Sequence, residues 1–173
     1  WFAHPYKKRG RLAQMNAVGF IAWSAVIDHA DLTLGKHVYI GDRCVIFQAD
    51  DGSVDLGGQV KLYSDVIMET GKGGRIVVGE NTHIQPRCLL LAYLGELEIG
   101  RRVEIAPHCA FYPYNHGLAA GKRIREQHLS TKGGISVGDD AWLGVGVTVL
   151  DGVHIAKGAV IGAGSVVTRD IPE

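Results

Sequence analysis

The C-terminal third of the chain repeats with a period of six residues. In the segment VGDDAWLGVGVTVLDGVHIAKGAVIGAGSVVTRDIP, the first residue of each hexad is a branched aliphatic: Val137, Leu143, Val149, Ile155, Ile161 and Val167. The second residue is usually tiny: Gly138, Gly144, Ala156 and Gly162. Neither a helical period of 3.6 nor simple alternation produces this frame. A hexapeptide repeat is typical of a parallel β-helix, in which three short strands and three turns close one triangular coil of about 18 residues.

The same frame recurs upstream, with short insertions between coils. Branched or large apolar residues again begin the hexads: Leu34, Ile40, Ile46, Leu56, Leu62, Met68, Val78, Ile84, Leu90, Ile99, Ile105 and Phe111. We therefore expect an all-β chain whose coils run from about Ile21 onward and bury these residues. With 173 residues, one compact domain over 1–173 is expected, with 1–20 as an N-terminal lead-in.

The repeat is interrupted once, in FYPYNHGLAAGKRIREQHLSTKGG, which runs from Phe111 to Gly134. No hexad frame fits this segment, and a His stands between an Asn and a Gly at its start. We predict that residues 117–134 leave the β-helix as an excursion loop.

Composition and cysteine placement narrow the function classes. Lys plus Arg and Asp plus Glu both number 18, so the net charge is zero. General nucleic-acid binding, which needs a basic field, is therefore not expected. Cys44, Cys88 and Cys109 form no CxxC pair, and each falls at the fifth position of a hexad, which suits a small, buried side chain. Catalytic thiols, a disulfide framework and a zinc ribbon are not expected, and a reducing cytoplasm fits best.

The N-terminal segment has basic residues followed by an apolar run, as a signal peptide does. The uninterrupted apolar part, Ala17 to Trp23, is too short to span a bilayer, and it fits the first coil. Contact with a membrane surface stays open for four basic residues: Lys7, Lys8, Arg9 and Arg11.

Two segments together resemble the left-handed β-helix acyltransferases: IAPHCAFYPYNHG, and then ISVGDDAWLGVGVTVLDGVHIAKGAVIGAGSVVTRDIP. The nearest groups are the maltose, galactoside and nodulation-factor O-acetyltransferases and their relatives in bacterial polysaccharide biosynthesis. The resemblance is dense over Ile99 to Pro172, and it implies left-handed coils and a homotrimer with acetyl-CoA in the groove between adjacent prisms. It implies an acetyl-CoA-dependent O-acetyltransferase acting on a sugar or polysaccharide precursor, by direct transfer within a ternary complex.

The resemblance also implies roles for single residues. His116 matches the general base, whose pKa near neutrality suits proton abstraction from a hydroxyl. Asn115 either orients His116, contacts the acceptor or is simply a turn residue. The oxyanion would meet the backbone N–H of Gly144 or Val145. Trp142 lies either near the acyl and pantetheine end of the cofactor or on the prism edge as a surface aromatic.

Cofactor residues follow from the same resemblance. Arg169, after Thr168, matches the position that meets the nucleotide, and Lys157 is a weaker candidate for a phosphate contact. Ala163 and Gly164 match positions close to pantetheine, where small residues also satisfy the fold alone. The chain departs from the family in two places. It ends at VTRDIPE, where the family continues through another half coil, and the usual acceptor residues are not recognisable between Arg87 and Glu98.

Alternative functions remain open on the sequence. A γ-class carbonic anhydrase-like zinc protein would need three His ligands, for which His83, His108 and His116 are the candidates, although the family's closely spaced His pair is missing. We expect no metal. N-acetylation of an amino sugar, serine acetylation and a non-catalytic scaffold or nucleotide-binding module are the other possibilities. The acceptor is either soluble or lipid-linked, and in the latter case it would bring the enzyme into peripheral contact with the membrane.

Overall fold

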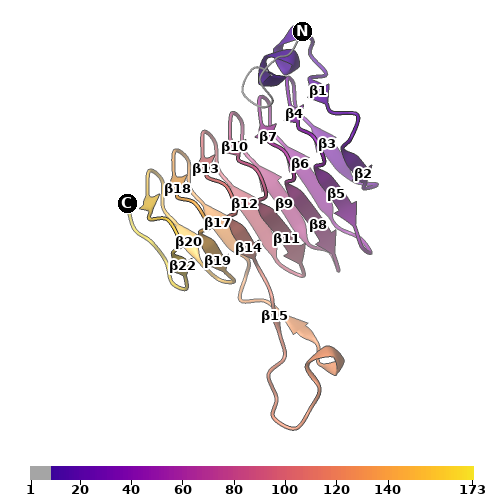
Figure 1. Ribbon diagram of the computed structural model, residues 1–173. Coiled ribbons are helices and arrows are strands. Elements are labelled where there is room, and N and C mark those ends of the chain that lie inside the picture. The colour runs from indigo at the N-terminus through magenta and orange to yellow at the C-terminus, as the bar shows by residue number, and fades with distance from the viewer. Residues whose placement is uncertain (1–8) are drawn as a thin grey trace.

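The computed structural model describes residues 9–173, which form a parallel β-helix with three faces (Figure 1). The first sheet contains β1 (Phe20–Ile21), β4 (Tyr39–Ile40), β7 (Lys61–Leu62), β10 (His83–Ile84), β13 (Glu104–Ile105), β18 (Trp142–Leu143) and β21 (Val160–Ile161). The second contains β2 (Val26–Asp28), β5 (Val45–Gln48), β8 (Ile67–Gly71), β11 (Leu89–Tyr93), β14 (Ala110–Tyr112), β19 (Thr148–Leu150) and β22 (Val166–Val167). The third contains β3 (Leu32–Leu34), β6 (Ser53–Leu56), β9 (Arg75–Val78), β12 (Glu96–Ile99), β17 (Ile135–Val137) and β20 (His154–Ile155). The predicted all-β parallel β-helix is confirmed.

The hexad frame explains the core. The first residue of each hexad points into the prism, and neighbouring coils place these residues in register, as in the pairing of Ile105 with Leu143. All of the predicted inward residues from Ile40 to Val167 are buried, with exposed fractions of 5% or less. Leu34 is the exception, being only partly buried, because β3 is the outermost strand of the third sheet.

The three cysteines lie where the repeat predicts, inside the prism at the turns. Each is about 1% exposed, and all three are free thiols. Their sulfurs donate to backbone carbonyls of the next coil; Cys109 Sγ, for example, lies 3.2 Å from the Gly144 oxygen. Each therefore serves as a small corner-filling side chain.

The small second residue of the hexad has a steric cause. At Gly144, an added Cβ would lie 2.7 Å from the Ala163 backbone nitrogen of the next coil. A side chain at this position would push adjacent coils apart, so the tight stacking of turns requires glycine there.

The N-terminal end of the described chain is a 3₁₀ helix, η1 (Arg9–Met15), which packs against β1 and β4. Ile21 and Ile27 fit the repeat but are about 40% exposed, because they belong to the first coil. Of the four basic residues considered for membrane contact, Lys7 and Lys8 lie outside the described residues. Arg9 pairs with Asp42 at 2.7 Å, and Arg11 is exposed. Among residues 9–173, no helix is long and apolar enough to cross a membrane.

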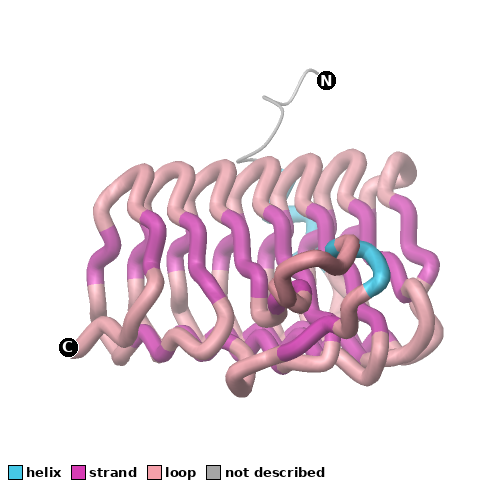
Figure 2. Tube along the Cα trace, turned by 90° about the horizontal axis from the view of Figure 1, so that it is seen from below, coloured by secondary structure: helices cyan, strands magenta, loops and turns pink. Residues whose placement is uncertain are grey.

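The excursion begins after β14, where the chain projects from the prism (Figures 1 and 2). Residues 115–134, here called the arm, contain the antiparallel strands β15 (Asn115–His116) and β16 (Leu129–Ser130), with the 3₁₀ helix η2 (Ile124–Glu126) between them. The chain rejoins the prism at β17. The predicted excursion is thus present, and it starts two residues earlier than expected.

Candidate functional site

The predicted site residues lie on different edges of the triangular prism. We call the edge between the first and second sheets the first corner, that between the second and third the second corner, and that between the third and first the third corner. The first corner carries Gly144, Val145, Ala163 and Gly164. The second carries Asn115, His116, Thr168 and Arg169. Lys157 lies at the third corner, and Trp142 lies on the first sheet. One chain therefore does not bring the predicted base together with the predicted oxyanion donor.

The first corner carries two backbone N–H groups that differ in their hydrogen bonds. The Gly144 N–H donates to the Ile161 carbonyl at 2.9 Å and is therefore engaged in the ladder between coils. The Val145 N–H has no acceptor among the residues described, and the Val145 side chain is 51% exposed. Of these two N–H groups, the Val145 N–H is thus the one without an acceptor among the described residues.

The predicted pantetheine positions stack directly on this turn. The Gly164 N–H donates to the Val145 carbonyl at 2.8 Å, which places Ala163 and Gly164 one coil further toward the C-terminus. Neighbouring strands lie about 4.8 Å apart. A cofactor arm running along this corner would therefore pass the Val145 N–H within one coil.

Trp142 lies on the first sheet, whereas Lys157 lies at the third corner. Trp142 projects outward from β18, in register with Glu104 and Val160, and is half exposed. Lys157 lies near Asp140, whose pKa is held below its ordinary value mainly by hydrogen bonds from Arg102 and to a smaller extent by Lys157. Arg169 lies at the second corner and Lys157 at the third, so the two side chains do not form one cationic site within a chain.

His116 stands at the point where the β-helix gives way to the arm. Its backbone pairs with Leu129 across the small antiparallel sheet, and its side chain is exposed. The Tyr114 ring approaches the imidazole at a centroid distance of 6.5 Å, in an edge-on arrangement. Within the described part of the chain, neither ring nitrogen of His116 has a hydrogen-bond partner, so both are available for a hydrogen bond with a ligand.

The Asn115 side chain is held by a contact with the prism. Its amide nitrogen donates to Asp151 Oδ2 at 2.9 Å, which directs the side chain away from His116 and toward the prism. Asp151 is 6% exposed, and its carboxylate also accepts from the far root of the arm: Thr131 Oγ1 at 2.9 Å, the Lys132 N–H at 2.7 Å and the Gly134 N–H at 3.2 Å. One buried carboxylate therefore ties both roots of the arm to the turn after β19.

Gln127 organises the arm itself. Its Oε1 accepts from the Ala119 N–H at 2.8 Å, and its Nε2 donates to the carbonyls of Ala119 and Lys122 at 3.3 and 3.2 Å. Three bonds from one side chain close the outer part of the arm. The arm is thus a folded element with its own hydrogen bonds.

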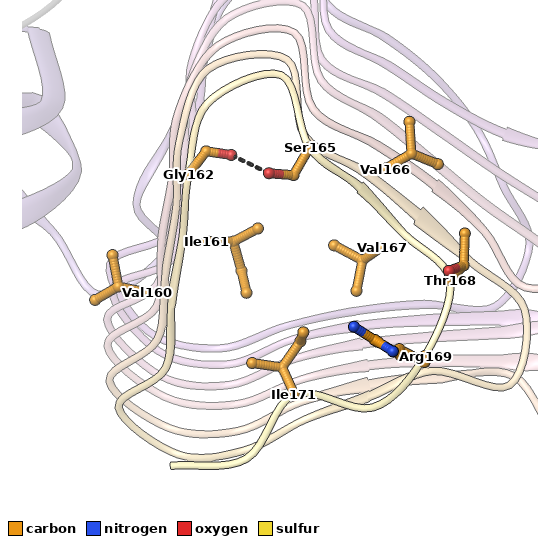
Figure 3. A pocket seen from close by; sticks show the side chains of 9 residues that line it. All are labelled: Val160, Ile161, Gly162, Ser165, Val166, Val167, Thr168, Arg169 and Ile171. Atoms are coloured by element: carbon orange, nitrogen blue, oxygen red, sulfur yellow. Dashed lines mark hydrogen bonds between the residues drawn. The ribbon is translucent and has the colours of Figure 1, made fainter.

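Thr168 and Arg169 line a hollow of about 450 Å³ at the end of the last coil (Figure 3). The inward residues Ile161, Val167 and Ile171 point into this hollow, and the Ser165 hydroxyl donates to the Gly162 carbonyl at its rim at 2.8 Å. Arg169 lies beside Val167 and Ile171, over the end of the core. The hollow is lined by residues of the last described coil, from β21 to Ile171.

The three histidines considered as zinc ligands are not assembled within one chain. His83 lies on β10 with Nδ1 2.8 Å from Glu104 Oε1, His108 lies at the first corner, and His116 lies at the second. Among residues 9–173, no three His, Cys, Asp or Glu side chains are placed to hold one metal ion.

Parts of the chain are similar in sequence to known proteins. The model of the bacterial transferase hexapeptide family (six repeats) matches residues 134–169. A galactoside O-acetyltransferase of Lactococcus lactis is 56% identical over 39 residues, which are 22% of this chain and 19% of that protein. The matched segment spans about a fifth of the length of the curated relatives.

Two solved structures share the fold over nearly the whole chain. An N-acyltransferase from Bacillus cereus, in complex with dTDP and coenzyme A, has a TM-score of 0.65 at 14% identity and covers 99% of this chain and 84% of its own. A GDP-perosamine N-acetyltransferase from Caulobacter crescentus, in complex with CoA and GDP-perosamine, has a TM-score of 0.55 at 24% identity. The match covers 96% of this chain and 57% of that protein. In its repeat, in the local sequence of its last coils and in its fold, the chain is therefore similar to the hexapeptide-repeat acyltransferases.

Proposed function

We propose that the protein is an acetyl-CoA-dependent acetyltransferase that acts on a hydroxyl of a sugar or polysaccharide precursor. The observation that carries the proposal is the exposed, unpaired imidazole of His116 at the root of an arm that leaves a hexapeptide β-helix. The named activity of the Lactococcus lactis relative supports the same class of reaction.

The proposed reaction is a direct transfer. The acceptor hydroxyl attacks the thioester carbon, while His116 takes the hydroxyl proton as general base. The oxyanion accepts a hydrogen bond from the Val145 N–H, and collapse of the intermediate breaks the carbon–sulfur bond. The proton then passes from His116 to the departing thiolate of CoA. A covalent acyl-enzyme on sulfur is not part of this proposal, because all three thiols are buried.

A homotrimer would complete the site. His116 and Val145 lie on different corners of one prism, so they can meet only across the groove between two neighbouring copies. The outward face of the second sheet supports such packing, because its register aligns Val26, Val45, Ile67 and Leu89 in an apolar row. Cyclic closure of three copies would bury rows of this kind.

Acetyl-CoA is the proposed cosubstrate. Its pantetheine would follow Ala163 and Gly164 along the first corner toward Val145, with Trp142 near the acyl end. Its phosphates would meet cationic side chains at the groove, for which Arg169 and Lys157 are proposed, with the neutral Thr168 hydroxyl as a further hydrogen-bond donor. The two solved relatives named above were each found with CoA. No role for a metal is proposed.

N-acetylation of an amino sugar is the second candidate. It is favoured by the names of the two solved relatives, an N-acyltransferase and a GDP-perosamine N-acetyltransferase. The same His116 could remove a proton from an attacking amine. We place either reaction in the cytoplasm, because the thiols are free and acetyl-CoA is an intracellular metabolite in the proposed role. A lipid-linked acceptor would add peripheral membrane contact.

Thiol release from acetyl-CoA tests the proposal. The purified protein should release CoA thiol when one member of a panel of sugars, nucleotide sugars and amino sugars is added, and mass spectrometry should find that member acetylated. Absence of transfer to every member, together with stoichiometric zinc and CO₂ hydration activity, would replace the proposal with the carbonic anhydrase alternative.

A further inference from the structure

Two tyrosines and a glutamate form a continuous surface beside His116. Tyr93, at the end of β11, lies next to Tyr114, with ring centroids 5.3 Å apart and planes inclined by 55°. Tyr114 in turn meets the His116 imidazole edge-on at 6.5 Å. The Tyr93 hydroxyl donates to Glu69 Oε1 on β8. Tyr93, Tyr114 and Glu69, here called the tyrosine face, are all partly exposed and lie at or near the second corner, on the N-terminal side of the arm.

Gly71 makes room for this arrangement. It pairs with Tyr93 in the second sheet, and an added Cβ would lie 2.5 Å from Tyr93 Cε1 and 2.9 Å from Cδ1. The ring therefore lies across the sheet over Gly71. Any side chain at position 71 would displace it, so the flat placement of Tyr93 depends on this glycine.

The surroundings of Tyr93 raise its pKa. Burial and the neighbouring Glu69 carboxylate both raise the Tyr93 pKa above its ordinary value, with the Asp50 charge acting in the same direction. The Tyr93 hydroxyl donates its hydrogen bond to Glu69. The second carboxylate oxygen of Glu69 has no partner among the described residues and can accept a further hydrogen bond.

The chemistry of the face matches a sugar ring. Aromatic rings offer apolar area with little conformational freedom to lose, and one face of a pyranose presents C–H groups that pack on such rings. A carboxylate accepts hydrogen bonds from hydroxyls strongly. The negative charges of Glu69 and Asp50 near Tyr93 would disfavour binding of a carboxylate or a phosphate on this face.

We propose that Tyr93, Tyr114 and Glu69 form a subsite for a non-anionic pyranoside unit of the acceptor, packed on the tyrosine rings next to His116. This inference rests on the proposed function in taking the acceptor as a sugar. It adds a specificity that the proposed function leaves open: a neutral or amino sugar is accepted, and a uronic acid is refused. The sugar ring on Tyr114 would direct one of its substituents toward the His116 imidazole.

Sugar binding can be measured in the absence of acetyl transfer. The method is saturation-transfer NMR on the full chain, with no acetyl-CoA present. The probes are methyl β-glucopyranoside, its 2-amino analogue and the corresponding methyl glucuronide. The variants are Gly71→Ala, which displaces the Tyr93 ring, and Tyr93→Phe, which keeps the ring and removes the bond to Glu69. Gly58→Ala is the matched control, because a Cβ there makes only ordinary contacts, the nearest at 3.4 Å.

The inference predicts that the neutral or amino glucoside binds the parent chain and the Gly58→Ala control, with the strongest saturation on ring C–H protons. The Gly71→Ala variant should bind roughly 3- to 10-fold more weakly, the range expected for losing one aromatic contact. The Tyr93→Phe variant should keep most of its affinity for the glucoside, because the ring that packs on the sugar is retained. The glucuronide should bind the parent chain most weakly of the three.

Equal binding by the parent and Gly71→Ala chains, or tightest binding of the glucuronide, would overturn the inference. Its failure is separable from that of the proposed function. If Gly71→Ala leaves acetyl transfer to sugars unchanged, the proposed function holds and the subsite is wrong. If sugar binding depends on Tyr93 but no acetyl transfer occurs, the subsite holds and the proposed function is wrong.

Discussion

Asn115 Nδ2 lies 2.9 Å from Asp151 Oδ2, and this bond joins the residue before His116 to a turn one coil further along the prism. Because Asp151 also accepts from Thr131, Lys132 and Gly134, it fixes the two roots of the arm relative to each other. The position of the His116 backbone is therefore set by a carboxylate that lies 36 residues from Asn115 in sequence.

Asp151→Ala should loosen the arm. The substitution leaves donors at both roots without their acceptor, which typically costs about 1–3 kcal/mol. We expect hydrogen exchange at Lys132 and Gly134 to accelerate, and turnover to fall through misplacement of His116, with little change in affinity for acetyl-CoA.

Asp170→Asn is the matched control for this prediction. Asp170 accepts from the His154 N–H at 2.8 Å at the same corner, is exposed and does not touch the arm. Unchanged exchange at Lys132 and Gly134 in Asp151→Ala would show that the arm does not depend on this carboxylate.

Arg169→Ala should weaken acetyl-CoA binding and spare kcat, because the proposed role of Arg169 is contact with the phosphates and not with the reacting atoms. Calorimetric titration of CoA and steady-state kinetics would separate the two effects. A fall in kcat at unchanged KM for acetyl-CoA would contradict a phosphate-binding role of Arg169.

The thiols should be unreactive in the folded protein. Burial raises the pKa of Cys44 to about 11, so this side chain is a neutral thiol at pH 8, and all three cysteines are about 1% exposed. Ellman's reagent should label none of them rapidly in buffer and all three in denaturant. Rapid labelling of one thiol in the native state would reopen the possibility of a cysteine nucleophile.

Phe111→Ala should destabilise the fold strongly. Phe111 is completely buried in the coil from which the arm departs, and removal of a buried Phe side chain typically costs about 3–5 kcal/mol. Val160→Ala, at an outward position that is 63% exposed, should change stability by about 0.5 kcal/mol or less. Urea unfolding of both variants tests the inward and outward assignment of the hexad.

The sequence predicted the β-helix because its signal is local and repeated. Each hexad independently places a branched residue inside and a small one at the turn, so Leu143 and Cys109 could be assigned without knowledge of their neighbours. Asp151 could not be identified in this way, because its partners are brought together only by coil stacking and by the return of the arm. The tyrosine face was missed for the same reason: Glu69, Tyr93 and Tyr114 come from three different coils, and Gly71 looks like any other turn glycine.

The hydrogen bonds of Asn115 and of the two oxyanion candidates are also visible only in the structure. A single sequence does not show that the Asn115 amide turns toward Asp151. Nor does it show that the Gly144 N–H is used in the ladder while the Val145 N–H is left open.

Replacement of His116 by Ala tests the central claim most directly. Steady-state kinetics with the acceptor identified by thiol release should show kcat lowered by roughly 10²- to 10⁴-fold, the usual contribution of a general base. Affinity for acetyl-CoA, measured by titration of the same variant, should stay unchanged, because the imidazole meets the acceptor hydroxyl and not the nucleotide. Near-normal turnover by His116→Ala with that acceptor would contradict the account.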